Sequence, residues 1–167
     1  MRLLYLALLL AVFWVAGARA QPAEGMEPLS AFPQSLLSVR TAAGKVINFQ
    51  IWLADTPRRD QQGLMFVKEM DAHAGMLFLF PGNQPVSMWM KNTYIPLDML
   101  FMDARGRVDY IAASTTPFST DIIGPNKPEF AVLELNGGAA ARFGIAVGDT
   151  VVHETFRKVP AKPTRGR

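Results

Sequence analysis

Residues 88–103, MWMKNTYIPLDMLFMD, decide the fold, because they set polar side chains inside the most apolar part of the chain. The polar residues are Lys91, Asn92, Thr93 and Asp98. An unpartnered buried polar group costs roughly 1–3 kcal/mol, so each must find a partner or line a site. After Pro96 both alternating sets of side chains are apolar, which indicates a central strand covered on both faces. We therefore expect Asp98 to be buried and held by a cation, such as Lys91, or by several backbone N–H groups.

The rest of the chain shows short strand patterns separated by turn signals. Strands are expected at 36–40, 45–53 and 75–80, and on both sides of 92–96. Further strands are expected around a turn at 103–106, at 129–135 and in the closing DTVVHETF stretch. Short helices are expected in DTPRRDQQG (55–63) and GGAAARFG (137–144). Residues 114–128 form a long Ser/Thr/Pro loop, a length that often carries function. The pattern predicts a mainly β fold: an antiparallel β-sandwich of jelly-roll type or a partly closed β-barrel, with one or two short helices.

The first twenty residues have the features of a secretory signal peptide. Arg2 precedes an apolar run over 3–15, and Ala18-Arg19-Ala20 fits an A-x-A cleavage site. This run is shorter than the roughly 20 residues that cross a bilayer, although an uncleaved N-terminal anchor is the alternative. We expect an exported protein, periplasmic or extracellular, with no transmembrane span in its mature form. Its expected parts are a signal peptide (1–20), a Pro/Ala-rich linker (21–34), a single β domain (35–156) and a basic disordered tail (157–167).

Charge and cysteine content exclude two classes of function. The whole chain carries a formal +3, but residues 21–156 hold ten Lys and Arg against fourteen Asp and Glu, a net −4. A nucleic-acid partner is therefore not expected, because binding phosphates requires a basic face on the folded domain. The chain has no Cys, so disulfides and thiolate chemistry are excluded.

Five stretches, in this order, carry a family resemblance: RRDQQGLMF, GMLFLF, WMKNTYIPLDMLFMD, AVLELNGG and GIAVGD. Together they resemble the uncharacterised family named domain of unknown function 192 (DUF192), over roughly residues 36–155. The resemblance implies a compact, mostly β, secreted or envelope-associated domain without an established activity. The matching positions are Arg59, Gly63, Met65, Gly75, Trp89, Lys91, Asn92, Thr93, Pro96, Asp98 and Glu134. The chain departs from the pattern at Met88, where Phe is usual, and at Val67, where Arg is usual; anion binding through that Arg would here need Lys68.

A binding module is the first functional hypothesis. A Trp beside Lys, Asn and Asp offers an apolar plate with directional hydrogen bonds for a small molecule, a glycan or an envelope partner. The candidate ligand-binding residues are Trp89, Lys91, Asn92, Thr93, Asp98, Arg59 and Glu134. Trp89 could instead be a residue of the packed core, and Asp98 could instead belong to a structural ion pair.

Two alternatives belong to other classes. A Cu(I) carrier would use thioethers such as those of Met88 and Met90, although Met clusters usually fill cores. A hydrolase would need a carboxylate pair, such as Asp98 with Glu134, at a suitable separation. No nucleophile motif accompanies them, and the two His residues lie far apart in sequence, so neither a zinc site nor a cofactor is expected.

Overall fold

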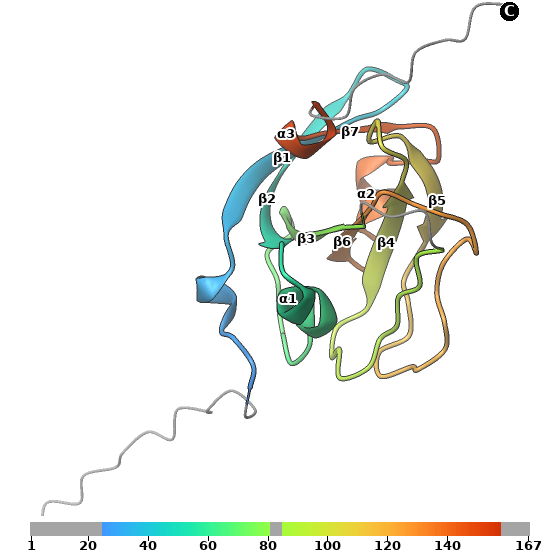
Figure 1. The fold of residues 1–167 in the computed structure, drawn as a ribbon. Helices are drawn as coiled ribbons and strands as arrows, with labels where there is room; N and C mark the ends of the chain where they lie inside the picture. Colours follow the sequence, from blue (N-terminus) through green and yellow to red (C-terminus); the bar gives the residue numbers. More distant parts are fainter. Residues whose placement is uncertain (1–24, 81–84, 158–167) are drawn as a thin grey trace, which may run out of the picture.

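The computed structural model describes residues 25–80 and 85–157. Its strands are β1 (Gln34–Arg40), β2 (Val46–Ala54), β3 (Ala74–Leu79), β4 (Leu97–Met102), β5 (Val108–Ala112), β6 (Ala131–Asn136) and β7 (Thr150–Val152); its helices are α1 (Pro57–Gln62), α2 (Ala139–Phe143), α3 (Glu154–Arg157) and a 3₁₀ turn, η1 (Leu29–Ala31). The strands form one sheet in the order β5-β4-β6-β3-β2-β1-β7. This sheet curls until it nearly closes into a barrel, which confirms the mainly β, partly closed barrel prediction (Figure 1).

Backbone hydrogen bonds near the start of β5 close most of the remaining gap. The Val108 N–H donates to the Asp149 carbonyl at 2.8 Å, and the Val151 N–H donates to the Gly106 carbonyl at 2.7 Å. Gly106 has a φ of 77°, a left-handed conformation that suits its predicted place in the turn between β4 and β5. The two ends of the sheet order are therefore joined through the residues that flank β5 and β7.

One strand pair departs from the antiparallel arrangement that the sequence suggested. β2 and β3 are parallel, while every other adjacent pair of strands is antiparallel. Parallel neighbours need a crossover connection, which residues 55–73 provide, including α1. The sequence did not show this crossover because α1 has only six residues, too few for a distinct helical period.

Strand β4 is central and covered on both faces, as the sequence predicted. All six of its residues are buried. Leu100 and Met102 belong to the core on one face of the sheet, whereas Met99 and Phe101 belong to the core on the other.

The stretch before β4 is not the additional strand that we expected. Residues 85–96 contain only isolated bridges, such as Met88 with Ile123, and a turn at Lys91 and Asn92. Asn92 has a φ of 56°, a left-handed conformation that Asn tolerates better than most residues. This turn interrupts the strand alternation and sends Lys91 to the surface.

The part of the predicted linker that is described packs on the domain. Residues 25–33 include η1 and contact α1, and β1 already begins at Gln34. Arg157, placed in the tail by the sequence, ends α3. The predicted signal peptide, the first linker residues, residues 81–84 and the predicted tail from 158 onward lie outside the described residues.

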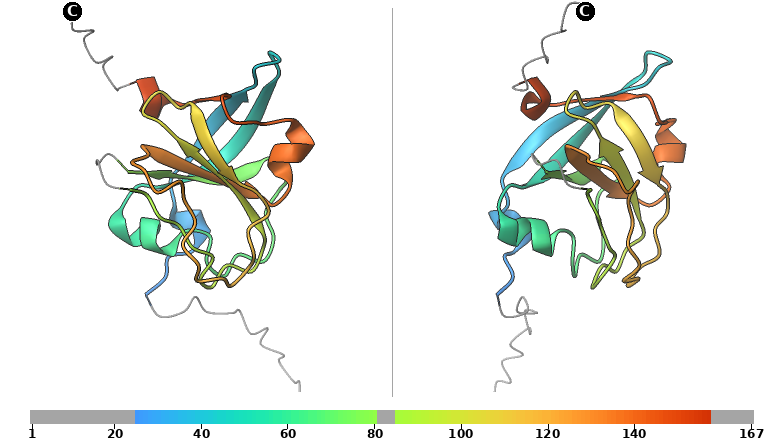
Figure 2. Two further views of the ribbon diagram at one scale, coloured as in Figure 1. Left: turned by 90° about the vertical axis from the view of Figure 1, so that its right-hand side faces the viewer. Right: turned by 45° about the vertical axis from the view of Figure 1, so that its right-hand side comes forward.

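Helix α1, the stretch 85–96 and the loop 113–130 gather at one end of the molecule, and β7 and α3 lie at the other (Figures 1 and 2). No helix in residues 25–80 and 85–157 combines the length and the apolar character that crossing a bilayer requires.

Candidate functional site

A groove of about 280 Å³ opens where the N-terminal segment, α1 and the turn at 91–92 meet. Its lining residues are Gly25, Met26, Arg58, Gln61, Gln62, Met65, Trp89, Lys91 and Asn92. The lining combines thioethers and an indole with amides and two cations, a mixture typical of small-molecule sites.

Trp89 is the main apolar surface of this groove. Its side chain is 45% exposed, so the competing interpretation of Trp89 as a buried core residue does not fit. The Lys91 ammonium lies 5.3 Å from the centre of the Trp89 ring, in cation–π geometry. Lys91 itself is exposed and is not paired with Asp98.

Backbone hydrogen bonds fix the turn that carries these two side chains. The Thr93 N–H donates to the Met90 carbonyl at 3.0 Å, and the Phe66 N–H donates to the Asn92 carbonyl at 2.9 Å. The Thr93 hydroxyl donates to the Lys91 carbonyl at 3.3 Å. The turn is therefore held both within itself and against the residues that follow α1.

Helix α1 begins and ends as the sequence predicted. The Thr56 side chain accepts from the Arg59 N–H at 3.3 Å, Pro57 occupies the first turn, and Gly63 follows the last residue with a φ of 50°. A side chain at Gly63 would also approach the Phe78 ring to 3.2 Å. Both features restrict position 63 to glycine and bring α1 close to the sheet.

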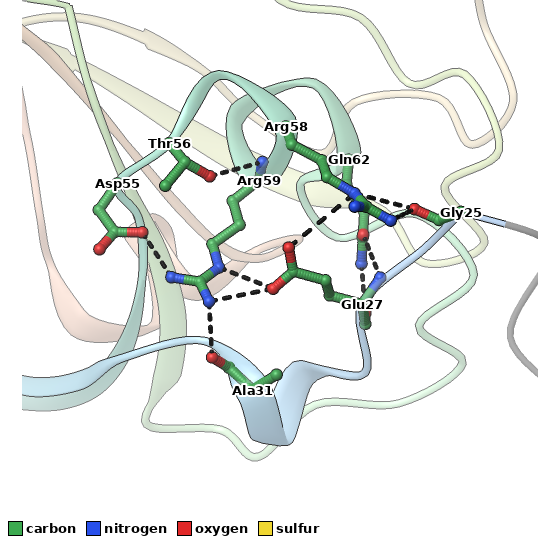
Figure 3. Close-up of polar contacts among 8 residues, drawn as sticks. All are labelled: Gly25, Glu27, Ala31, Asp55, Thr56, Arg58, Arg59 and Gln62. Atoms are coloured by element: carbon green, nitrogen blue, oxygen red, sulfur yellow. Dashed lines mark hydrogen bonds and ion pairs between the residues drawn. The ribbon is translucent and has the colours of Figure 1, made fainter.

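Gln62 and Arg59 hold the N-terminal segment against α1 (Figure 3). The Gln62 amide donates to the Glu27 carbonyl at 2.7 Å and accepts from the Glu27 N–H at 2.8 Å. Arg59 donates to the Glu27 carboxylate at 3.0 Å, to the Asp55 carboxylate at 2.8 Å and to the Ala31 carbonyl at 2.9 Å. Arg59 is thus a structural clamp that positions one wall of the groove and does not line it.

The contacts of Arg59 explain its raised pKa. Hydrogen bonds to Asp55 and then to Glu27 raise the pKa of the Arg59 guanidinium, against an opposing effect of desolvation. Arg58, the residue before it in α1, donates to the Gly25 carbonyl and lies 3.9 Å from a Glu27 carboxylate oxygen. Both arginines therefore serve the packing of residues 25–31.

A second, smaller cavity of about 30 Å³ lies next to the groove. Five residues line both spaces: Gln61, Gln62, Met65, Trp89 and Lys91. The small cavity is further lined by Asp60, Gly63, Leu64, Phe78, Met88, Thr93 and Glu134. We call it the inner cavity; two of its lining residues, Asp60 and Glu134, carry carboxyl groups.

Glu134 is the most unusual group in the inner cavity. It is 4% exposed and stands in β6 opposite Met76 of β3 and Met99 of β4, in the core that lies on this face of the sheet. No group in residues 25–80 and 85–157 donates a hydrogen bond to its carboxyl or forms an ion pair with it. Burial, and to a smaller extent the charge of Asp60, raises the pKa of Glu134 to about 8.

Asp60 is the second carboxyl group of the inner cavity. Its Oδ1 atom is buried and has no hydrogen-bond partner among the described residues. Burial raises the pKa of Asp60 to about 6. The cavity therefore contains two carboxyl groups that no described residue pairs with a cation. With its pKa raised to about 8, Glu134 is mainly protonated at pH 7.

Asp98 lies outside this site. It is fully buried, and its Oδ1 accepts from the N–H groups of Ser114 at 2.7 Å and Gly138 at 2.9 Å, while Oδ2 accepts from Ala140 at 2.7 Å. The expectation that several backbone N–H groups hold Asp98 is confirmed, and the pairing with Lys91 is not found. Asp98 connects β4 to the start of α2 and to the loop after β5.

The pairing of Asp98 with Glu134 as hydrolytic carboxylates is also not found. Asp98 stands opposite Leu135 and Glu134 stands opposite Met99, so alternation sends their side chains to opposite faces of the sheet.

The two methionines proposed for copper lie in different surroundings. Met90 is fully buried in the core, where the Thr115 hydroxyl lies 3.1 Å from its sulfur, while Met88 lines the inner cavity. Among the described residues, no group of three or more His, Cys, Asp or Glu side chains is arranged to hold a metal ion.

Of the sequence-predicted site residues, the structure brings together Trp89, Lys91, Asn92, Thr93 and Glu134 and leaves out Asp98 and Arg59. Sequence reasoning missed Asp60, because PRRDQQ is polar throughout and resembles a solvated helix face. Leu64 lies beyond the end of α1, so no helical spacing relates it to Asp60 and no local sequence signal marks this residue.

The comparisons with known proteins give a family and a fold. The family DUF192, described as "Uncharacterized ACR", matches residues 38–153. A structure from Sinorhizobium meliloti, described as a "putative transcription regulator", is 39% identical, covers 74% of this chain and 96% of its own, and superposes with a TM-score of 0.72. A protein of unknown function from Novosphingobium aromaticivorans is 38% identical, covers 80% and 94%, and has a TM-score of 0.71. No curated protein is significantly similar to the chain.

Proposed function

The chain belongs to the DUF192 family, and for it we propose a binding function: an exported, single-domain β-protein that holds a small saccharide in the groove beside Trp89. The single observation that carries the proposal is the exposure of this Trp at the mouth of a preformed groove. An indole that is 45% exposed leaves apolar area in water, and a bound sugar ring would cover it with its C–H face.

Polar groups around Trp89 suit a polyhydroxylated ligand. The side-chain amides of Gln61 and Asn92 and the ammonium of Lys91 line the same groove. Amides both donate and accept, so they match hydroxyl groups, which do the same. The Gln62 amide is not available to a ligand, because both of its ends are bonded to Glu27.

Other functions have less support. The inner cavity admits only a group about the size of a water molecule, so a glycosidic bond would not reach Glu134, and we do not propose a hydrolase. The S. meliloti protein is described as a regulator of transcription, but residues 21–156 of this chain carry a net −4, which does not favour DNA binding. Export rests on the signal-peptide features of residues 1–20 and is tested by fractionating cells that express the full chain.

Tryptophan fluorescence tests the binding proposal. The probes are trimers of glucose, glucosamine and N-acetylglucosamine, added separately. Covering Trp89 should shift its emission to shorter wavelength, with saturation. Trp89→Ala should abolish the response. Trp52→Phe, in strand β2 and outside the lining of both the groove and the inner cavity, should preserve it. If no trimer binds by fluorescence or calorimetry, the proposal is wrong.

A further inference from the structure

We propose that the inner cavity is the subsite for a primary ammonium group, so that the preferred ligands of the groove are amino sugars whose amine is free rather than acetylated. The inference rests on the proposed saccharide-binding function and adds the substituent that the ligand must carry. Three features support it: the size of the cavity, its acceptors and the lack of an ion pair to its carboxyl groups among the described residues.

Size is the first argument. The inner cavity measures about 30 Å³, enough for one small group such as a water molecule or an –NH₃⁺. An acetamido group has four heavy atoms and would not enter without displacing its walls. Those walls include the Phe78 ring and Leu64, which are both almost fully buried and belong to the packed core.

Acceptors are the second argument. An ammonium group has three N–H donors and no acceptor. Glu134 and Asp60 offer carboxyl oxygens that no described residue engages within the cavity. The Thr93 hydroxyl uses its proton on the Lys91 carbonyl, so its oxygen remains able to accept. Asp60, Thr93 and Glu134 can thus accept hydrogen bonds from the three N–H groups of the ammonium.

Lys91 is a cationic residue that lines the inner cavity, but it forms no ion pair with the carboxyl groups there. Lys91 lies over the Trp89 ring, and Arg58 is bonded to Gly25 and near Glu27. Among residues 25–80 and 85–157, the ion pairs include neither Asp60 nor Glu134. Two carboxyl groups with a hydroxyl are also a poor set for a metal, and the described residues bring no third acidic or His ligand.

The inner cavity and the groove share lining residues, and this indicates where the rest of the ligand would lie. Trp89 and Lys91 line both the inner cavity and the groove. A ligand whose ammonium enters the inner cavity can therefore lay its sugar ring on Trp89 and direct its hydroxyls to Gln61 and Asn92.

Proton release gives this subsite a distinctive signature. Free Glu134 holds its proton below pH 8, and a bound ammonium stabilises the carboxylate instead. At pH 6.5 the amine of the ligand is charged, so binding should release about one proton per ligand. An uncharged acetamido sugar should release none.

Isothermal titration calorimetry of the purified protein at pH 6.5 tests the inference, in two buffers that differ in ionisation enthalpy. The probes are the glucosamine trimer, the N-acetylglucosamine trimer and free lysine. The glucosamine trimer should bind at least about tenfold more tightly than the acetylated trimer and release about one proton. Glu134→Gln and, independently, Asp60→Asn should reduce the preference and the proton release, whereas Glu69→Gln, an exposed carboxylate outside the cavity, should change neither.

The outcomes separate the two proposals. Equal binding of the two trimers, or binding of the glucosamine trimer without proton release, overturns the ammonium subsite and leaves saccharide binding intact. Lysine binding as tightly as the glucosamine trimer overturns the assignment to amino sugars. If only the glucose trimer binds, the ammonium subsite is wrong and saccharide binding stands. If none of the three trimers binds, saccharide binding itself is wrong, and the subsite fails with it.

Discussion

Asp98 and Glu134 are two buried carboxyl groups on neighbouring strands, one step apart in register, and the protein treats them in opposite ways. Asp98 accepts three backbone N–H groups at 2.7–2.9 Å on one face of the sheet. Glu134, on the other face, receives no hydrogen bond from any described residue and lines a cavity beside an open groove.

The difference separates a structural carboxylate from a candidate functional one. A carboxylate that several N–H groups hold stabilises the fold, because those groups would otherwise lose a partner in a buried or part-buried place. A carboxyl group with no partner reduces stability when it ionises. Residues that lower the stability of the fold and make no stabilising contact in it are expected at functional sites. Substitutions on the two faces should therefore have opposite effects.

Removing Asp98 should have the largest effect. Asp98→Ala leaves three N–H groups without their acceptor, that of Ala140 fully buried and two part-buried, and should lower the free energy of unfolding by roughly 3–5 kcal/mol. Urea unfolding followed by circular dichroism measures the change. Asp103→Ala is the matched control, because Asp103 accepts two N–H groups in an exposed turn and should cost only roughly 1 kcal/mol. Equal losses would contradict a special structural role for Asp98.

Removing the charge of Glu134 should stabilise the protein at high pH. The pKa in the folded state, about 8, lies above the ordinary 4.5, so the unfolded chain loses this proton first. Stability should therefore fall as the pH rises from about 4.5 to 8 and then level off.

Glu134→Gln should remove most of that fall. At pH 9 the variant should be more stable than the parent by roughly 2–4 kcal/mol, less than the full shift because the amide also lacks partners. At pH 4 the two proteins should differ little. Thermal unfolding across pH 4–9 measures both curves, and parallel curves would show that Glu134 ionises normally.

Releasing the N-terminal segment should have a moderate effect. Gln62→Ala removes two hydrogen bonds to Glu27 and should cost roughly 1–2 kcal/mol of stability. It should also weaken binding in the groove, because Gly25 and Met26 form one wall. Hydrogen exchange should then show faster exchange at residues 25–31, while β4 and β6 stay protected. Unchanged exchange at 25–31 would contradict the clamp.

Changing Trp89 should affect stability least and binding most. Because the side chain is 45% exposed, Trp89→Ala should alter the free energy of unfolding by less than about 1 kcal/mol. Binding of the saccharide trimers should nevertheless be lost. A large loss of stability would instead mean that Trp89 serves packing.

Much of this contrast could be predicted from the sequence. The burial of Asp98 followed from its position in a strand with apolar residues on both alternating faces, and its partners were limited to a cation or backbone donors. Glu134 lies on the same side of its strand as Val132, and this alternation is a local signal of its burial.

The sequence did not show that Trp89 is exposed or that Asp60 lies near Glu134. These two features depend on the turn at 91–92 and on the crossover between β2 and β3. Left-handed Asn92 breaks the strand pattern that would have buried Trp89, and no local signal indicates this for a residue in an apolar stretch. Asp60 reaches Glu134 only because β2 and β3 are parallel and the connection carries α1 over the sheet. Such non-local pairing is not contained in the periodicity of either segment.

The most direct measurement is an NMR titration of the Glu134 carboxyl carbon in the free protein, with Glu134→Gln to assign the signal. A midpoint near pH 8, moving to lower pH when the glucosamine trimer is added, is the result that an unpartnered ligand-binding acid requires. A midpoint near 4.5 in the free protein would contradict this description of the inner cavity.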